Sequence, residues 1–150
     1  MSSAQGSDLL RPKPPVIIFD SSVLLQIIAT GQFLILRSLQ SDFGVQSAIV
    51  PAVESEVLVI VENVPKFRGR REQFKKALRN RTLAIVDRDF LAPFLGGAAD
   101  SWIRQINSEG TRLYDFVDRG EAFTHAASMV LNALVATNDT TAVSRLVRQG

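Results

Sequence analysis

Short apolar runs and helix-like stretches alternate along the chain. Four apolar runs stand at residues 16–19, 45–50, 83–86 and 133–136. The first of them is continuous and rich in β-branched residues, as in a strand that is buried on both faces. We expect a strand at each of the four runs.

Between the runs, apolar residues recur at the spacing of one helix face. The pattern predicts helices at residues 23 to about 29, 33–39, 51 up to Pro65, 70–80, 98–107, 121–132 and 140–148, and it leaves residues 90–97 open. Ser21 or Ser22 is the expected N-cap of the first helix, and Gly31 separates the first two. Strands that alternate with helices in this way predict a three-layer α/β/α fold with a central, mostly parallel sheet.

The length of 150 residues fits one domain with a core of its own. Residues 1–15 are polar and end in a proline-rich stretch, so we expect a flexible N-terminal tail before a single domain at residues 16–150. The chain has no cysteine, which excludes disulfides, thiolate zinc sites and cysteine nucleophiles. No secretory signal is evident and the apolar runs are too short to span a bilayer, so we expect a cytoplasmic protein without a membrane partner.

Basic residues are concentrated in one segment. The whole chain carries a net charge of only +2, but residues 66–81 contain eight basic residues against the single acid Glu72, a net +7. A basic stretch alone is more often a solvated helix face, whereas a basic stretch beside acidic motifs suits an enzyme that holds metal ions and a phosphate backbone together. The candidates for binding a nucleic-acid backbone are Arg68, Arg70, Arg71, Lys75 and Lys76.

Two aspartates each follow an apolar run and precede a helix-like stretch. Asp20 comes directly after residues 16–19, and Asp139 follows residues 133–136 after Thr137 and Asn138. Open parallel sheets bind their ligands beyond the carboxyl ends of the strands. An Asp at such a position is also a good helix N-cap, but two of them at corresponding strand ends define the rim of a pocket.

Two glutamates stand in the first turns of predicted helices. Glu56 lies next to the inward-facing Val57, and Glu121 stands beside the apolar Ala122. The helix dipole favours a carboxylate at either place, yet a residue that only decorates the surface would more often lie opposite the apolar face. Glu54 is the alternative to Glu56, and because the two are two residues apart they point to different faces of the helix.

Together these motifs resemble the PIN-domain family of metal-dependent ribonucleases. The motifs that carry the resemblance are Ile18-Phe19-Asp20-Ser21-Ser22, Pro51-Ala52-Val53-Glu54-Ser55-Glu56, Gly120-Glu121-Ala122 and Thr137-Asn138-Asp139. They stand in the order of the family's four motifs and span roughly residues 16–145. Many members of the similar subgroup have two adjacent acids after the Thr, and here Asn138 stands in the place of the first.

The resemblance implies a PIN-like fold and the hydrolysis of phosphodiester bonds of RNA with Mg²⁺ or Mn²⁺. The implied site consists of the metal-binding and catalytic acids Asp20, Glu56, Glu121 and Asp139, supported by the hydroxyl groups of Ser22 and Thr137. Oxygen ligands of this kind select hard cations over zinc, and such cations polarise a phosphate and activate water. The resemblance further implies an RNA substrate, a homodimer and, for the toxin of a toxin–antitoxin pair, an antitoxin protein as partner.

Other functions would use the same residues differently. A module that binds RNA or a protein without cleaving is favoured by Asn138, which lowers the local negative charge. A phosphatase with Asp20 as nucleophile would need a second acid where the chain has Ser22. The single histidine, His125, and the aromatic Trp102 are expected to be structural.

Overall fold

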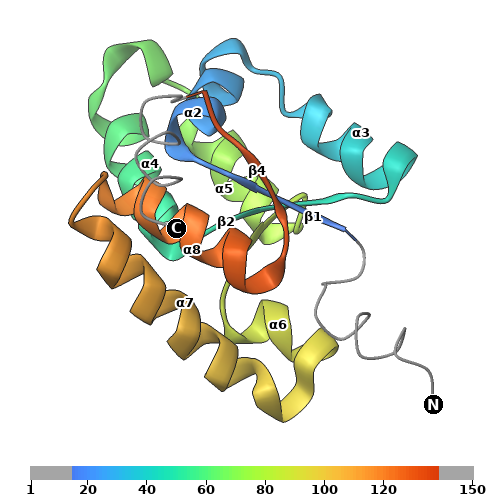
Figure 1. Ribbon diagram of the computed structural model, residues 1–150. Helices are drawn as coiled ribbons and strands as arrows, with labels where there is room; N and C mark the ends of the chain where they lie inside the picture. The colour runs from blue at the N-terminus through green and yellow to red at the C-terminus, as the bar shows by residue number, and fades with distance from the viewer. Residues whose placement is uncertain (1–14, 139–150) are drawn as a thin grey trace.

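The computed structural model describes residues 15–138 of the chain (Figure 1). The strands are β1 (Val16–Phe19), β2 (Gln46–Ile49), β3 (Leu83–Ile85) and β4 (Leu134–Ala136). The helices are α2 (Ser21–Thr30), α3 (Leu34–Phe43), α4 (Pro51–Asn63), α5 (Arg71–Arg79), α6 (Arg88–Leu95), α7 (Ala99–Tyr114) and α8 (Arg119–Leu131), with short 3-10 turns η1 (Pro65–Phe67) and η2 (Gly96–Ala98). The predicted helix at residues 140–148 and the predicted tail lie outside the described residues.

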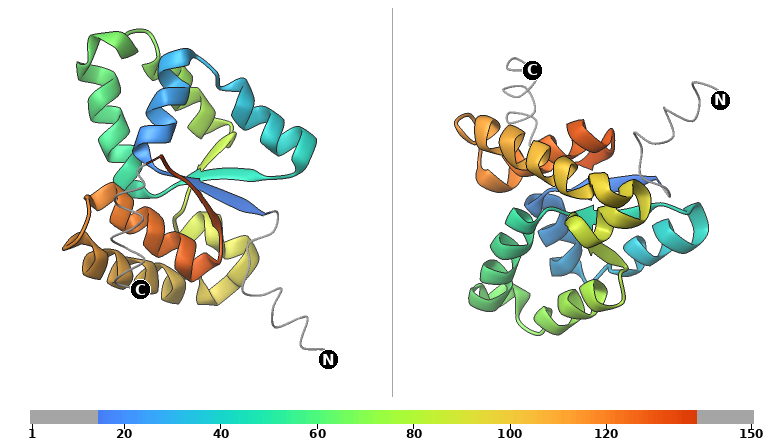
Figure 2. Two further views of the ribbon diagram at one scale, coloured as in Figure 1. Left: turned by 45° about the horizontal axis from the view of Figure 1, so that its top comes forward. Right: turned by 90° about the horizontal axis from the view of Figure 1, so that it is seen from below.

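The four strands form one parallel sheet in the order β3-β2-β1-β4. Helices α2 to α5 cover one face, and α6 to α8 cover the other (Figure 2). The three-layer α/β/α prediction is therefore confirmed. The chain moves outward from β1 to β2 and β3, and then crosses the opposite face to place β4 on the other side of β1. The strand order thus reverses between β1 and β4, and in open α/β sheets ligands bind at such a switch point.

The carboxyl ends of all four strands lie at one edge of the sheet, because the strands are parallel. Asp20 follows β1, the first turns of α4 follow β2, Asp87 follows β3, and Thr137 and Asn138 follow β4. The sequence motifs far apart along the chain are therefore brought to a single edge by the topology.

Several helix boundaries and caps differ from those predicted. Asp20, rather than Ser21 or Ser22, is the N-cap of α2, since its Oδ1 accepts the backbone N–H of Val23 at 3.0 Å. The predicted helix at residues 98–107 continues to Tyr114, because Gly110 and Leu113 extend its buried face. The open stretch at residues 90–97 forms α6 and η2, and Asp87 caps α6.

The core consists of the inward faces of the helices and most of the two central strands, β1 and β2. Its largest fully buried side chains include Phe74, Ile18, Leu24, Ile28, Ile49, Leu83 and Leu91. Helix α8 has a small-residue surface at Ala122, Ala126 and Ala127, all buried, which lets it approach the sheet closely. At the standard value of about 25 cal/mol per Å² of apolar surface, each large buried side chain contributes ~2 kcal/mol.

No single helix among residues 15–138 is long and apolar enough to cross a membrane. Helices α2 and α3 are long and apolar enough only when their lengths are added together, and the two helices are bent by 108° relative to each other.

Candidate active site

Asp20 is the buried centre of the edge at which the strand order reverses. It is 1% exposed, and its backbone N–H donates to the carbonyl of Ala136 at 3.0 Å, which ties it to the end of β4. Its Oδ1 accepts hydrogen bonds from Val23 N at 3.0 Å and from Ser22 Oγ at 2.9 Å. Its Oδ2 is buried and has no hydrogen-bond partner among the described residues. A buried carboxylate oxygen without a partner is costly, so this atom marks a place where a ligand would be stabilising.

Ser22 links Asp20 to the end of β4. Its Oγ lies 2.9 Å from Asp20 Oδ1 and 2.6 Å from Asn138 Oδ1. A hydroxyl carries one proton and can donate fully to only one of these oxygens at a time. Asn138 and Ser22 are both exposed, and Thr137, which precedes Asn138 after the end of β4, is half-buried. The first and fourth motifs therefore meet through side chains across 116 residues of sequence.

Glu56 reaches this edge from α4. Its Oε1 accepts a hydrogen bond from Ser21 Oγ at 3.3 Å, and its Oε2 lies 2.5 Å from where a Cβ would stand on Gly120. Partial burial raises the pKa of the Glu56 carboxyl, and the nearby charges of Asp118 and Asp20 raise it further, while the hydrogen bond from Ser21 acts in the opposite direction. Glu56, Asp118 and Asp20 thus share one electrostatic environment, with Gly120 leaving room for the carboxylate.

Glu54 points to a different neighbour. Burial raises the pKa of the Glu54 carboxyl. The negative charge of Asp87, which follows β3, raises this pKa further, whereas Asp20 is the neighbour of Glu56. The two glutamates of α4 therefore belong to different ends of the same sheet edge, and Glu56 is the one that lies with Asp20.

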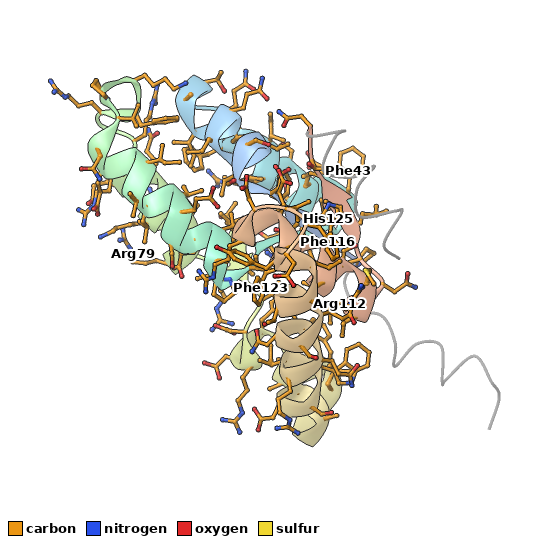
Figure 3. The ribbon with its side chains drawn as sticks, turned by 60° about the vertical axis from the view of Figure 1, so that its left-hand side comes forward. Phe43, Arg79, Arg112, Phe116, Phe123 and His125 are labelled. Carbon is orange, nitrogen blue, oxygen red and sulfur yellow. The ribbon has the colours of Figure 1, made fainter. Side chains whose placement is uncertain are left out.

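Glu121 and His125 stand one turn apart on the same face of α8, and both are partly buried. Burial lowers the pKa of His125, and the negative charge of Asp20 partly offsets that effect. His125 and Phe123 project from different sides of α8 (Figure 3). The expectation that His125 is structural is not contradicted, since burial is the main influence on its pKa and the charge of Asp20 is the smaller one.

Among residues 15–138, no three His, Asp or Glu side chains are close enough together to hold a metal ion by themselves. The predicted fourth acid, Asp139, lies outside the described residues. The described part of the chain therefore brings Asp20, Ser22, Asn138 and Glu56 to one edge, with Glu121 on the neighbouring helix.

The basic candidates differ in what they contact. Arg71 Nε donates to Glu62 at 2.8 Å, and Arg70 Nη1 donates to Gln73 at 3.2 Å. The Arg70 guanidinium also packs over Gly31, the C-cap of α2, where a Cβ would lie 2.9 Å from Arg70 Nη1. Arg71 therefore connects α5 to α4, and Arg70 connects the start of α5 to the end of α2. The other three candidates have no such contact and are exposed or half-buried: Arg68, Lys75 and Lys76.

The basic segment does not adjoin the acids. Helix α4 rises about 10 Å between Glu56 and Asn63, at 1.5 Å per residue, before η1 begins. Helix α5 then leads to the start of β3, which lies at the opposite edge of the sheet from Asp20. Figure 2 shows both helices in the layer that also contains α2. A nucleic acid that contacts both regions would therefore have to extend along this layer.

Comparison of the chain with protein-family models, with curated protein sequences and with solved structures finds no match.

Proposed function

We propose that the protein is a ribonuclease of the PIN-like kind, which hydrolyses phosphodiester bonds of RNA with Mg²⁺ or Mn²⁺. The observation that carries this proposal is the buried, unpartnered Oδ2 of Asp20 at the switch point of a parallel sheet. Glu56 shares the electrostatic environment of Asp20. The order of the four acidic motifs along the sequence supports the same function, and Asp20, Glu56 and Glu121 stand after β1 or in the first turns of α4 and α8 as the resemblance implies.

The residues at this edge fit a hard cation. The side chains of the first and second motifs that form hydrogen bonds at this edge, those of Asp20, Ser21, Ser22 and Glu56, all do so through oxygen atoms, and the chain has no cysteine thiolate. Mg²⁺ usually keeps several waters and binds through one or two carboxylates together with substrate phosphates, so a complete protein cage of three acids is not needed. Asp20 and Glu56 would hold the cation, with Glu121 and Asp139 in the roles that the resemblance implies. When bound, the cation would supply charge stabilisation at the phosphate and a more acidic water.

The protein's own residues would position the reacting groups. Ser22 holds the orientation of Asp20 through the 2.9 Å hydrogen bond to Oδ1, which leaves Oδ2 directed away from the cap. Glu56 would orient the attacking water through a hydrogen bond to its carboxylate, beside the cation that it would share with Asp20. The basic residues of η1 and α5 would hold the RNA backbone by charge, which implies binding that weakens with salt and depends little on sequence.

The direct test is a cleavage assay with a fluorogenic single-stranded RNA. We expect cleavage with Mn²⁺ or Mg²⁺ and none with excess chelator, with activity restored when the cation is returned. The same assay with a DNA of equal sequence tests whether the protein cleaves RNA in preference to DNA. An absence of metal-dependent cleavage for both nucleic acids would refute the nuclease.

Asn138 favours a second candidate, a PIN-like module that binds RNA or a protein without cleaving. Its side chain lies within 2.6 Å of Ser22, at the position where an acid would add charge next to Asp20. Substituting Asn138→Asp should therefore tighten Mn²⁺ binding by about tenfold, equivalent to ~1.4 kcal/mol, as measured by calorimetry. A rise in cleavage from nothing to a measurable rate in this variant would favour the non-cleaving module for the natural chain. An unchanged metal affinity would instead show that residue 138 lies outside the cation's reach.

The pH dependence of stability tests the environment of Glu56. A raised pKa means that the folded protein binds the proton more readily than the unfolded chain, so the ionised form opposes folding above the ordinary value of 4.5. This destabilisation by the ionised Glu56 disappears as the pH falls through the pKa that Glu56 has in the folded protein. Glu56→Gln should therefore be more stable than the natural protein at neutral pH, and this difference should shrink toward pH 4. Thermal melts over that range provide the measurement, and Asp42→Asn, which removes an exposed acid of α3 that forms no salt bridge within the described residues, is the control.

Gly120 is expected to control the position of Glu56. A Cβ there would lie 2.5 Å from Glu56 Oε2, which is the mobile end of a side chain and can move away. Gly120→Ala should leave the melting temperature unchanged or slightly higher, because Ala favours a helix over Gly by up to about 1 kcal/mol. Mn²⁺ affinity should fall by about tenfold as Glu56 is displaced. Equal metal affinity in calorimetry would contradict the role of Glu56 as a ligand.

The proposal extends to a cytoplasmic toxin with an antitoxin partner and a homodimeric assembly. Exposed apolar side chains on α3 outside that helix's first residue, Ile35 at 44% and Phe43 at 73%, support a surface that a protein partner or a second copy would cover. Figure 3 shows Phe43 at the outside of the fold. Co-expression with a neighbouring small gene product, followed by mass measurement of the complex, tests both partners.

A further inference from the structure

A pocket lies between α3 and α5, far from the acidic edge. It has a volume of about 190 Å³ and is lined by residues that include Phe33, Leu34, Arg37, Lys76 and Asn80. At about 30 Å³ per water molecule, this is the space of roughly six waters, which suits one small planar group rather than a folded partner. The pocket is distinct from the site around Asp20 because none of its lining residues belongs to that site.

The pocket combines an apolar part with two cations. Phe33 is half-buried and Leu34 is largely exposed, and together they form the apolar part. Arg37 comes from α3 and Lys76 from α5, and both side chains are exposed. Neither forms a salt bridge with any residue in the described part of the chain. By contrast, Arg71 in the same layer is paired with Glu62. The positively charged side chains of Arg37 and Lys76 are therefore available to a ligand in a way that Arg71 is not.

The walls of the pocket are held by hydrogen bonds that do not involve the two cations. Asn80 Oδ1 accepts from Thr82 N at 3.1 Å and from Thr82 Oγ1 at 2.7 Å, which fixes the turn after α5. At the other wall, Gly31 adopts φ +68° and the Arg70 guanidinium packs over it. The pocket is therefore formed before any ligand arrives, and Arg37 and Lys76 can be replaced without removing its supports.

We propose that this pocket binds one nucleotide of single-stranded RNA, with its base on Phe33 and its phosphate between Arg37 and Lys76. The proposal rests on the proposed function for the identity of the polymer. Charge complementarity favours RNA, because Arg37 extends the +7 segment of residues 66–81 onto a second helix. Stacking of a base on an aromatic ring beside a basic groove is the usual means by which proteins hold single strands without reading their sequence.

The distance between the pocket and Asp20 is compatible with one continuous strand. Helix α2 starts directly after Asp20 and ends at Gly31 in the pocket wall, and its ten residues span about 15 Å. An RNA whose phosphate lies at Asp20 would therefore pass along α2 and place a nucleotide a short distance away in the pocket. The pocket would then act as an anchor outside the cleavage site.

The test measures binding in the absence of cleavage. The full chain carrying Asp20→Asn is titrated with a short fluorescein-labelled oligouridine in excess chelator, over a range of NaCl concentrations. Replacing both basic side chains with Arg37→Ala and Lys76→Ala should lower the slope of log K against log salt by about 0.7, since each phosphate contact on a single strand contributes about 0.7 and the two side chains hold the same phosphate. The matched control removes Arg88 and Arg104, two exposed arginines of the opposite layer, and should leave the slope unchanged.

A second variant isolates the base. Phe33→Leu keeps an apolar side chain but removes the aromatic ring, and it should weaken oligouridine binding by at least about fivefold. The same variant should bind an abasic oligonucleotide of equal length as well as the parent does. A general loss of packing would weaken both probes alike, so the difference between them reports on stacking.

The alternatives predict different results. A salt slope that stays the same after loss of Arg37 and Lys76 overturns the proposal, even if the protein binds and cleaves RNA elsewhere. A pocket that serves as an interface between copies would show a loss of dimer mass in light scattering with an unchanged slope, which also overturns it. Failure of metal-dependent cleavage by the natural chain, with the slope change present, would refute the nuclease and leave RNA binding at this pocket in place.

Discussion

Replacing Asp20 with Asn should reduce metal-dependent RNA cleavage by at least about 100-fold while the fold is retained. Asn caps helices as well as Asp does, so the variant keeps an oxygen that accepts from Val23 N. What it loses is the negative charge at the buried Oδ2, which has no other partner among the described residues. Loss of a cation's charge stabilisation costs several kcal/mol of transition-state binding, and ~2.7 kcal/mol already corresponds to a factor of about 100 in rate.

The measurement is a cleavage time course with saturating Mn²⁺, accompanied by a thermal melt. The melting temperature should change little, because the cap is preserved. Glu54→Gln is the matched control, since Glu54 is a partly buried acid of the same sheet edge that lies toward Asp87 instead. Asp20→Ala should add a loss of stability of about 0.5–2 kcal/mol, the usual cost of removing a helix cap. Cleavage by the Asn variant at the natural rate would show that Asp20 does not bind the cation.

Replacing Gly110 with Val should lower the melting temperature by roughly 2–12 °C. Gly110 lies on the buried face of α7, and a Cβ there would stand 2.5 Å from Cδ1 of the Phe123 ring on α8. Three atoms of the ring lie within 2.7 Å of that position, so the ring as a whole would have to move. The Arg119 guanidinium lies over the ring at 5.6 Å, so a displaced ring would also lose this cation–π contact. Overpacking of this kind costs about 1–3 kcal/mol, and each kcal/mol shifts the melting temperature of a chain of this size by roughly 2–4 °C or somewhat more.

A double-mutant cycle separates this contact from backbone effects. Phe123→Ala alone removes the ring, and Gly110→Val combined with Phe123→Ala should be less destabilised than the sum of the two single variants, because the clash is gone. Gly97→Ala is the control, since a Cβ there meets nothing within 4 Å. Strict additivity of the two changes would mean that the helices do not meet at this point.

The same contact connects stability to the site. The helices α7 and α8 pack against each other along much of their length, and α8 carries Gly120, Glu121 and His125. A shift of α8 away from α7 would move the surface on which the Glu56 carboxylate rests. We therefore expect Gly110→Val to reduce cleavage as well, by less than the change at Asp20.

The elements of the fold could be predicted from local patterns. The apolar run at residues 16–19 is β1 over the same residues, and the helix after Pro51 ends before Pro65 as expected. Gly31 ends α2 with φ +68°, the conformation that made it the expected break. These features depend on side chains within a few residues of one another, so the sequence alone contains the information. Boundaries such as the extension of α7 to Tyr114 were missed because they depend on what the last turns pack against.

The sequence by itself predicted the four strands, most of the helices and the three-layer class, and it offered Asp20, Glu56, Glu121 and Asp139 as a set of acids that could act together. The tertiary structure alone decided that β4 lies beside β1, which creates the switch point at Asp20 and brings Asn138 to Ser22. It alone separated Glu56 from Glu54, by turning one toward Asp20 and the other toward Asp87. It also placed the basic segment along a helical layer instead of beside the acids. Local preferences act over a few residues, whereas strand order and side-chain direction depend on packing between segments that are far apart in the chain.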